Sequence, residues 1–130
     1  MSNRLTPGIT GEAVTAVGES NTAVAYGSGG VKVFATPAMI GLMEKAALTS
    51  VQPYLAEGLT TVGIRVNVEH LAATPIGMQV FATSRLTEID GKRLVFQVEA
   101  RDEMEIIGRG VHERFIVAEE KFLTRAAKKK

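Results

Sequence analysis

The sequence contains no cysteine and no tryptophan, and aromatic residues make up only 5% of its 130 residues. The lack of cysteine excludes a disulfide scaffold, thiolate metal ligands and a cysteine nucleophile. Its 2 histidines, His70 and His112, lie too far apart in sequence to form a typical zinc-binding motif, so we expect no metal site. A chain of this length that is 45% hydrophobic can still bury one substantial core.

An excess of charge of one sign is also missing, because 15 Lys and Arg residues face 14 Asp and Glu residues and the formal net charge is +1. Such a balance predicts no general attraction to nucleic acid or to an anionic membrane. No apolar run is long enough to span a membrane, and the first residues, MSNRLTPGITGEA, show no secretory signal. We therefore expect a cytoplasmic protein with one domain over residues 1–130, ending in a solvated, frayed basic tail at about 124–130.

The segment FATPAMIGLMEKAA, at residues 34–47, is typical of the beginning of a helix. Thr36 is a suitable N-cap, and Pro37 suits the first helical position because its missing N–H would have no partner there. Pro53 would stop the helix shortly after Val51. The sequence thus predicts one long helix from about Pro37 to Val51.

Strand patterns lie on both sides of this predicted helix. Residues 12–17 and 21–26 form short runs of β character before it. After it, the even-numbered residues from Val62 to Val68 are apolar and alternate with mostly polar ones, which predicts a strand with one buried face. A hairpin is predicted at Asp90-Gly91. Further strands are predicted at residues 78–88, 94–104 and 106–117. One helix is the only cover available for such a sheet, so we predict an α+β architecture in which an antiparallel sheet wraps a central helix.

Glu44 interrupts the apolar face of the predicted helix. At about 3.6 residues per turn, a single stripe is formed by Ile40, Met43, Ala47, Leu48 and Val51. Glu44 is one turn from Ile40 and from Leu48, so we predict that it lies inside this stripe rather than at its edge. A buried, unpaired carboxylate costs several kcal/mol or takes up a proton. Glu44 is therefore either a catalytic group or a structural one that reaches the rim or pairs with an arginine of the sheet.

His70 continues the apolar alternation at the end of its predicted strand, so we expect it to point toward the helix side of the sheet. It is either a satisfied core residue or one half of a general acid–base pair with Glu44 at the helix–sheet interface. Thr36 places a hydroxyl at the start of the helix, either as a simple N-cap or beside backbone N–H groups that can stabilise an oxyanion. His112 shares a strand face with Arg114, and we interpret it as structural.

Three segments occur in order along the chain: FATPAMIGLMEKAA at residues 34–47, VEHLAATPIGM at 68–78 and IGRGVHERFIV at 107–117. Together they resemble the fluoroacetyl-CoA thioesterase-like family of hotdog-fold proteins, over residues 31–122. The resemblance implies the hotdog fold, with a long helix wrapped by an antiparallel sheet. It also implies dimers with sites at the subunit interface, and hydrolysis of a short acyl-CoA thioester to the free acid and coenzyme A.

The resemblance assigns roles to individual residues. Thr36, Glu44 and His70 match the family's catalytic threonine, glutamate and histidine. Arg114 matches an arginine near the site and is a candidate for substrate binding, as are the backbone N–H groups near Ala38, which could bind a developing oxyanion. Thr36 and Glu44 lie about 12 Å apart along a helix, so they either flank the substrate or are completed by a second subunit. Glu44 could act as a nucleophile, as a base or as the group that orients His70.

We accordingly expect a homodimer or a dimer of dimers that needs no cofactor, since coenzyme A is part of the substrate. The segment GSGGVKV at residues 27–33 is short and glycine-rich where fluoroacetyl-specific relatives look to have an aromatic lid. The resemblance therefore does not imply a fluoroacetyl preference.

Two other functions stay open. A hotdog hydratase or dehydratase also uses a histidine and an acidic residue, although in the familiar dehydratase the histidine precedes the helix carboxylate. A non-catalytic module would bind acyl-CoA or another small ligand, with Glu44 and His70 as a structural pair.

Overall fold

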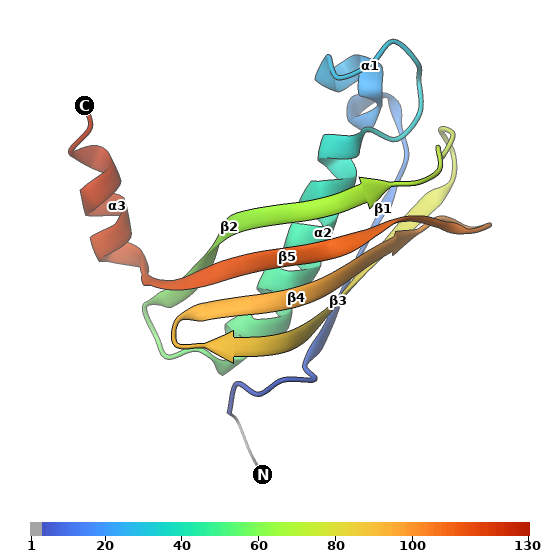
Figure 1. Ribbon diagram of the computed structural model, residues 1–130. Helices are drawn as coiled ribbons and strands as arrows, with labels where there is room; N and C mark the ends of the chain where they lie inside the picture. The colour runs from blue at the N-terminus through green and yellow to red at the C-terminus, as the bar shows by residue number, and fades with distance from the viewer. Residues whose placement is uncertain (1–3) are drawn as a thin grey trace.

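A computed structural model describes residues 4–130, and its strands form one 5-stranded antiparallel sheet (Figure 1). The strands are β1 (Thr10–Ala16), β2 (Leu59–His70), β3 (Gln79–Asp90), β4 (Arg93–Arg101) and β5 (Ile106–Ala118). Their order across the sheet is β1-β3-β4-β5-β2, so β1 and β2 form its edges. The helices are η1 (Glu19–Asn21), α1 (Ala23–Tyr26), α2 (Thr36–Val51), η2 (Gln52–Tyr54) and α3 (Glu119–Ala127). The long helix α2 lies across one face of the sheet, which curls around it (Figure 1). The predicted α+β architecture, with one long helix wrapped by an antiparallel sheet, is confirmed.

The buried face of α2 is rotated from the predicted stripe. Its buried side chains are Met39, Leu42, Met43, Ala46, Ala47, Ser50 and Val51. The prediction is confirmed for Met43, Ala47 and Val51, but it is wrong for Ile40 and Leu48, which are only half-buried. These two residues lie on the flank of the helix.

The rotation follows from the close approach of β1 to one side of α2. A Cβ on Gly11 would overlap the Ala46 carbonyl oxygen and would lie 2.6 Å from Cβ of Ser50. Glycine at this position therefore lets the strand contact the helix backbone, which draws the Ala46–Ser50 side of α2 into the core. Large buried side chains of the sheet complete this core: Val80, Leu86, Leu94, Phe96 and Ile107.

The predicted hairpin between β3 and β4 is confirmed. Asp90 pairs with Arg93, and the turn begins at Gly91, whose φ of 62° is a conformation that glycine adopts readily. The predicted strands at 78–88, 94–104 and 106–117 correspond to β3, β4 and β5, with small differences at their ends.

The segment 21–26, predicted as a strand, is helical for most of its length. The Thr22 side chain accepts a hydrogen bond of 3.2 Å from the Ala25 N–H and so caps α1. Gly27 ends this helix in the left-handed conformation, with φ of 69°. Local capping therefore decides the structure of a run that is too short for its β propensity to prevail.

A β-bulge changes which side chains of β2 face the helix. The pairing of β2 with β5 shifts register between Gly63 and Arg65, which leaves Ile64 as an extra residue. Before the bulge, the odd-numbered residues face α2: Thr61 is buried, and a Cβ on Gly63 would meet the Glu44 side chain. One extra residue reverses the alternation, so the even-numbered residues face α2 after the bulge.

The single buried face predicted from Val62 to Val68 is therefore wrong. Ile64 is 51% exposed and Val66 is 40% exposed, because the strand lies at the sheet edge and the alternation changes within it. The prediction that His70 points toward the helix is confirmed, since its ring contacts Thr36 at the beginning of α2.

Helix α3 follows β5 directly and projects away from the sheet (Figure 1). The frayed tail predicted at 124–130 is wrong for residues up to Ala127, which are helical, although every residue from 124 to 130 is exposed. Glu119 in the first turn and Arg125 in the last turn complement the helix dipole. Within the part of the chain that the structure describes, no helix is long and apolar enough to cross a membrane.

Candidate active site

The side chains of Thr36 and His70 are in direct contact. Thr36 is the first residue of α2, and His70 is the last residue of β2. Thr36 Oγ1 lies 2.7 Å from His70 Nδ1. The prediction that Thr36 is the N-cap is wrong, because Ala35 holds that position with an extended backbone and no side chain caps the helix. The Thr36 hydroxyl is bonded to the imidazole instead of to the helix backbone.

The His70 ring is half-buried, and its environment favours the neutral form. Burial is the largest influence on the pKa of His70 and lowers it below the ordinary value. In the tautomer with the proton on Nε2, Nδ1 accepts a hydrogen bond from the Thr36 hydroxyl. Nε2 is buried and has no hydrogen-bond partner among residues 4–130. One ring nitrogen is thus bonded to Thr36, and the other is left without a partner by the described part of the chain.

A cavity of about 300 Å³ opens beside this pair. Its walls combine the loop before α2 with the segment after β2: Ala23, Ser28, Val33, Phe34, Thr36, His70, Leu71, Ala72 and Ala73. Ala38 lies in the first turn of α2, where Met39 N–H donates to the Ala35 carbonyl at 3.0 Å. Since this bond begins the helical ladder, the Ala38 N–H precedes it and belongs to the groups that a helix leaves unpaired.

Glu44 lies on the flank of α2, so the prediction that it sits inside the buried stripe is wrong. It is half-buried, on the line of Ile40 and Leu48, and faces β2. A Cβ on Gly63 would lie 2.9 Å from Glu44 Oε2, so this glycine leaves space for the carboxylate. Among residues 4–130, no ion pair within 4.0 Å includes Glu44. The direct arginine pair considered for Glu44 is therefore not formed.

Arg114 and His112 form a buried network beside Glu44. Arg114 Nε donates to Thr61 Oγ1 at 2.8 Å, and Nη2 donates to the Thr61 carbonyl at 2.9 Å. Arg114 Nη1 contacts His112 Nε2 at 3.2 Å. Burial lowers the pKa of Arg114, and the nearby Glu44 carboxylate raises it. Burial is the larger influence, so the net pKa of Arg114 lies below its ordinary value, and this residue, which is only 6% exposed, forms no ion pair within 4.0 Å with the carboxylate beside it.

The structure brings the candidate residues together as two groups. Thr36 and Ala38 lie in the first turn of α2, and His70 of β2 lies beside them. Glu44 is eight residues after Thr36 on the helix, which is about 12 Å along its axis. Arg114 of β5 lies near Glu44 and forms the second group with it. Within residues 4–130, no group of 3 or more His, Asp or Glu side chains is placed to hold a metal ion.

Sequence reasoning missed Thr61 and Gly63 as parts of the second group. Gly63 pairs with Arg114 across β2 and β5, and paired residues share a face of the sheet. The Gly-x-His-x-Arg alternation in β5 was the available signal, because it places a histidine and an arginine on one face. Only the bulge at Ile64 shows which residues of β2 lie opposite them.

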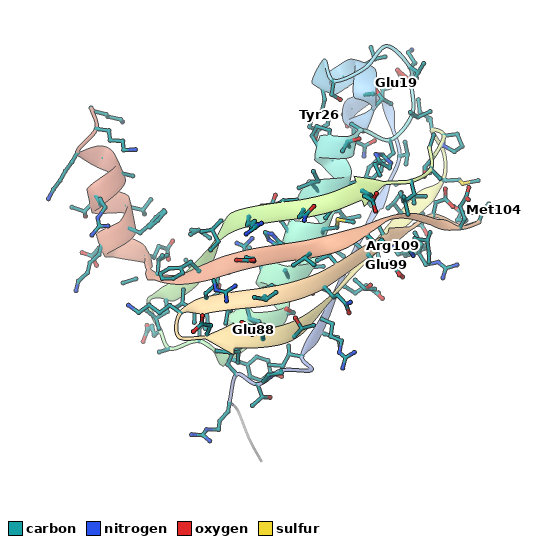
Figure 2. The ribbon with its side chains drawn as sticks, in the orientation of Figure 1. Glu19, Tyr26, Glu88, Glu99, Met104 and Arg109 are labelled. Carbon is teal, nitrogen blue, oxygen red and sulfur yellow. The ribbon has the colours of Figure 1, made fainter. Side chains whose placement is uncertain are left out.

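A larger hollow lies elsewhere, on the sheet face turned away from α2. It measures about 1040 Å³ and spreads over all the strands. Glu99 of β4 and Arg109 of β5 are opposite each other in the strand register there (Figure 2), and further charged residues of both signs line the hollow. No candidate residue lines it, so the smaller cavity at Thr36 and His70 has the chemistry of a site.

Comparison with known proteins places the chain in a family. The model of a family described as fluoroacetyl-CoA-specific thioesterase, FlK, matches residues 17–120. The fluoroacetyl-CoA thioesterase of Streptantibioticus cattleyicolor is 42% identical over 98 residues, which are 75% of this chain and 70% of that protein. The solved structure of FlK has a TM-score of 0.91 at 34% identity, covering 97% of this chain and 98% of that one. A variant of FlK has been solved in complex with acetyl-CoA.

A hot-dog-like protein from Thermanaerovibrio acidaminovorans matches with a TM-score of 0.86 at 24% identity, covering 96% of this chain and 93% of that one. This likeness concerns the fold alone, and with the FlK structure it confirms the predicted hotdog fold. The chain belongs to the family of fluoroacetyl-CoA-specific thioesterases.

Proposed function

We propose that this thioesterase hydrolyses a short acyl-CoA to the free acid and coenzyme A, with its reaction centre at Thr36 and His70. Family membership supports the reaction class. The single observation that supports the position of the centre is the 2.7 Å contact between Thr36 Oγ1 and His70 Nδ1. We also propose that residues 1–130 form one hotdog thioesterase domain.

His70 has the geometry of a general base. A hydroxyl within about 2.6–3.2 Å of an imidazole nitrogen is close enough to transfer its proton. Burial lowers the pKa of His70, which keeps the ring neutral and ready to accept a proton at neutral pH. We propose that Thr36 supplies or holds the attacking hydroxyl, and that His70 receives its proton.

The remaining candidate residues supply electrostatic support. The Ala38 N–H at the beginning of α2 is a donor for the developing oxyanion, favoured by the helix dipole. Arg114 is a candidate for substrate binding, and Glu44 acts as nucleophile, as base or as an orienting group near Arg114. Within one copy of the chain Glu44 and His70 belong to separate groups, so we propose that substrate bridges them or that a second copy completes the set.

We propose a homodimer or a dimer of dimers with the site at the subunit interface. β2 is an edge strand, and Ile64 and Val66 expose 51% and 40% of their surfaces on it. An open edge with apolar side chains favours pairing with another chain. Light scattering at micromolar protein concentration tests this point, and a clean monomer would contradict the interface site.

The proposed acyl group is short, and fluorine is not required. The cavity beside Thr36 and His70 is about 300 Å³, at the small end of ligand pockets. Of residues 27–33, only Ser28 and Val33 line this cavity, so the glycine-rich segment contributes no aromatic side chain to it, and Phe34 is the one aromatic residue among its lining residues. We therefore expect acetyl-CoA and similar short thioesters to be hydrolysed at rates comparable to that of fluoroacetyl-CoA.

Release of coenzyme A from a panel of acyl-CoA thioesters tests the proposed function. The panel includes acetyl-, fluoroacetyl-, butyryl- and octanoyl-CoA, and we expect turnover to decrease with chain length. The matched control is His70→Ala, which should abolish most of the release. If no thioester is cleaved but acyl-CoA raises the melting temperature, the protein is a binding module instead. Hydration of an enoyl-CoA without release of coenzyme A would indicate a hydratase.

The proposal also covers the cofactor requirement, the cellular location and the partners of the enzyme. We propose that the enzyme needs no cofactor, that it acts in the cytoplasm, and that its partners are small acyl-CoA molecules rather than nucleic acid or membrane. Activity of extensively dialysed protein in the presence of a chelator would test the first of these.

A further inference from the structure

His112 is held in one tautomer by its two ring hydrogen bonds. Its Nδ1 lies 2.8 Å from the Arg65 carbonyl oxygen, which can only accept, so Nδ1 carries the proton. Its Nε2 lies 3.2 Å from Arg114 Nη1, which can only donate, so Nε2 offers its lone pair. Both contacts are satisfied together only by a neutral ring with the proton on Nδ1.

The surroundings of His112 hold the ring in place. The side chain is 1% exposed and stacks on Phe96 of the neighbouring strand, with 6.3 Å between ring centroids and 30° between planes. Burial is the largest influence on the His112 pKa and lowers it, as does Arg114, whereas the Arg65 carbonyl, Glu44 and Glu113 raise it. The net shift is downward, which agrees with the neutral ring that the hydrogen bonds require.

His112 and Thr61 together fix the orientation of Arg114. Thr61 accepts from Nε and Nη2, and His112 accepts from Nη1, so each nitrogen of the guanidinium has one bonded N–H. A guanidinium has five N–H groups, which leaves two for a ligand or for Glu44. The position of a Cβ on Gly63 lies 3.5 Å from Nη1 and 2.9 Å from Glu44 Oε2, so all these groups surround one small space.

A neutral acceptor has a consequence that a carboxylate would not have. Aspartate or glutamate at this position would form a buried ion pair with Arg114 and cancel its charge. An imidazole fixes the direction of the guanidinium and leaves its charge available. If His112 only filled space in the core, it would not need a nitrogen that accepts from Arg114, because an apolar ring could stack on Phe96 equally well.

We infer that His112 is a positioning residue that orients Arg114 in the proposed thioesterase reaction. This inference rests on the proposed function, because Arg114 is there the candidate for substrate binding. The proposed effect of His112 passes through Arg114 alone, because His112 is not among the residues that line the cavity beside Thr36 and His70.

Two substitutions separate the two hydrogen bonds of the ring. In His112→Asn, the amide nitrogen replaces Nδ1 and can still donate to the Arg65 carbonyl, but the acceptor for Arg114 is lost. In His112→Gln, the amide reaches the position of Nε2 and can offer its oxygen to Arg114. With acetyl-CoA as substrate, we expect kcat/KM to fall about tenfold or more in His112→Asn and to recover at least partly in His112→Gln.

A double-mutant cycle tests whether the effect passes through Arg114. Arg114→Lys keeps the charge but loses the planar fork that His112 and Thr61 hold. In that background, His112→Asn should lower kcat/KM by less than about twofold further. Multiplying effects, or a folded His112→Asn protein with wild-type kcat/KM, would overturn the inference.

The tautomer gives a readout that needs no catalysis. Ring nitrogen NMR of the wild-type protein near neutral pH should show a protonated Nδ1 and an unprotonated Nε2 for His112. The opposite tautomer, or a charged ring, would reject the inference even if a variant failed to fold. If the wild-type protein shows the expected tautomer yet cleaves no acyl-CoA, the proposed function fails while the orientation of Arg114 stands.

Discussion

Thr36 and His70 are 34 residues apart in the sequence, yet Thr36 Oγ1 lies 2.7 Å from His70 Nδ1. The contact forms because α2 begins beside the place where β2 ends, and because Ala35 rather than Thr36 caps the helix. A threonine hydroxyl that capped the helix would be occupied by a backbone N–H. Here it is available to a neutral imidazole.

Removal of the imidazole should affect rate much more than folding. We expect His70→Ala to lower kcat for a short acyl-CoA by about 10²-fold or more, as for the loss of a general base. The ring lies at a strand end and is only half-buried, so the melting temperature should change little. Thr36→Val should reduce the rate as well, whereas Thr36→Ser keeps the hydroxyl and should retain activity. A folded and fully active His70→Ala protein would remove His70 from the mechanism.

Neutralisation of Glu44 should separate a catalytic role from a structural one. Glu44→Gln keeps the shape of the side chain and removes its charge. Because Glu44 is half-buried and forms no ion pair within 4.0 Å among residues 4–130, we expect unfolding free energy to change by less than about 1 kcal/mol. Turnover of acetyl-CoA should fall strongly, because we propose that substrate or a second copy of the chain brings this charge to the reaction centre.

The control for this substitution is Glu57→Gln, at an exposed position away from both groups of candidate residues. It should alter neither rate nor melting temperature. Loss of stability in Glu44→Gln by about 3 kcal/mol with full activity would instead indicate that the carboxylate serves only to balance Arg114.

The sequence predicted the central helix, the hairpin and the anomalous side chains because each depends on a local pattern. Period-two alternation, an Asp-Gly turn and a proline at a helix start are visible within a few residues. The bulge at Ile64 is not, because it depends on how β2 and β5 pair, and it reverses the faces of β2 in the middle of the strand. The position of Glu44 on the flank of α2 likewise depends on the contact between Gly11 and the helix backbone. Both errors come from tertiary packing, and both concern the site.

The absence of a side chain at Gly63 should matter for activity. An alanine Cβ would lie 2.9 Å from Glu44 Oε2 and 3.2 Å from His112 Cε1, so the flexible carboxylate would have to move. Gly63 does not have a positive φ, so Gly63→Ala introduces no backbone strain, but the buried His112 ring would also have to give way, and we expect stability to fall by about 1 kcal/mol or more. We expect kcat/KM to fall about tenfold or more, because small displacements of reacting groups are costly.

Gly41→Ala is the matched control for this change. Gly41 lies on the exposed side of α2, where a Cβ would meet no atom within 4 Å beyond the backbone of its own helix. Alanine at this position should therefore raise helix stability and leave the rate unchanged. Equal activity of Gly63→Ala and wild type would show that the placement of Glu44 tolerates displacement.

Stability should depend on pH through both histidines. Burial is the largest cause of the lowered pKa of His70 and of His112 in the folded protein. In the unfolded chain each histidine titrates near pH 6.5, about its ordinary value. Between the folded and the unfolded pKa values the unfolded chain binds more protons, so stability rises with pH there. The contribution is complete above about pH 6.5 and is lost as the pH falls from that value through the folded pKa values. Melting temperatures measured between about pH 7.5 and 5.0 should therefore decrease toward acid.

The chain has 2 histidines, so His70→Asn combined with His112→Asn should flatten this dependence. A double variant with the wild-type slope would assign the pH dependence to other groups, and a wild-type protein that is more stable at about pH 5.0 would show that the sign of the shifts is wrong.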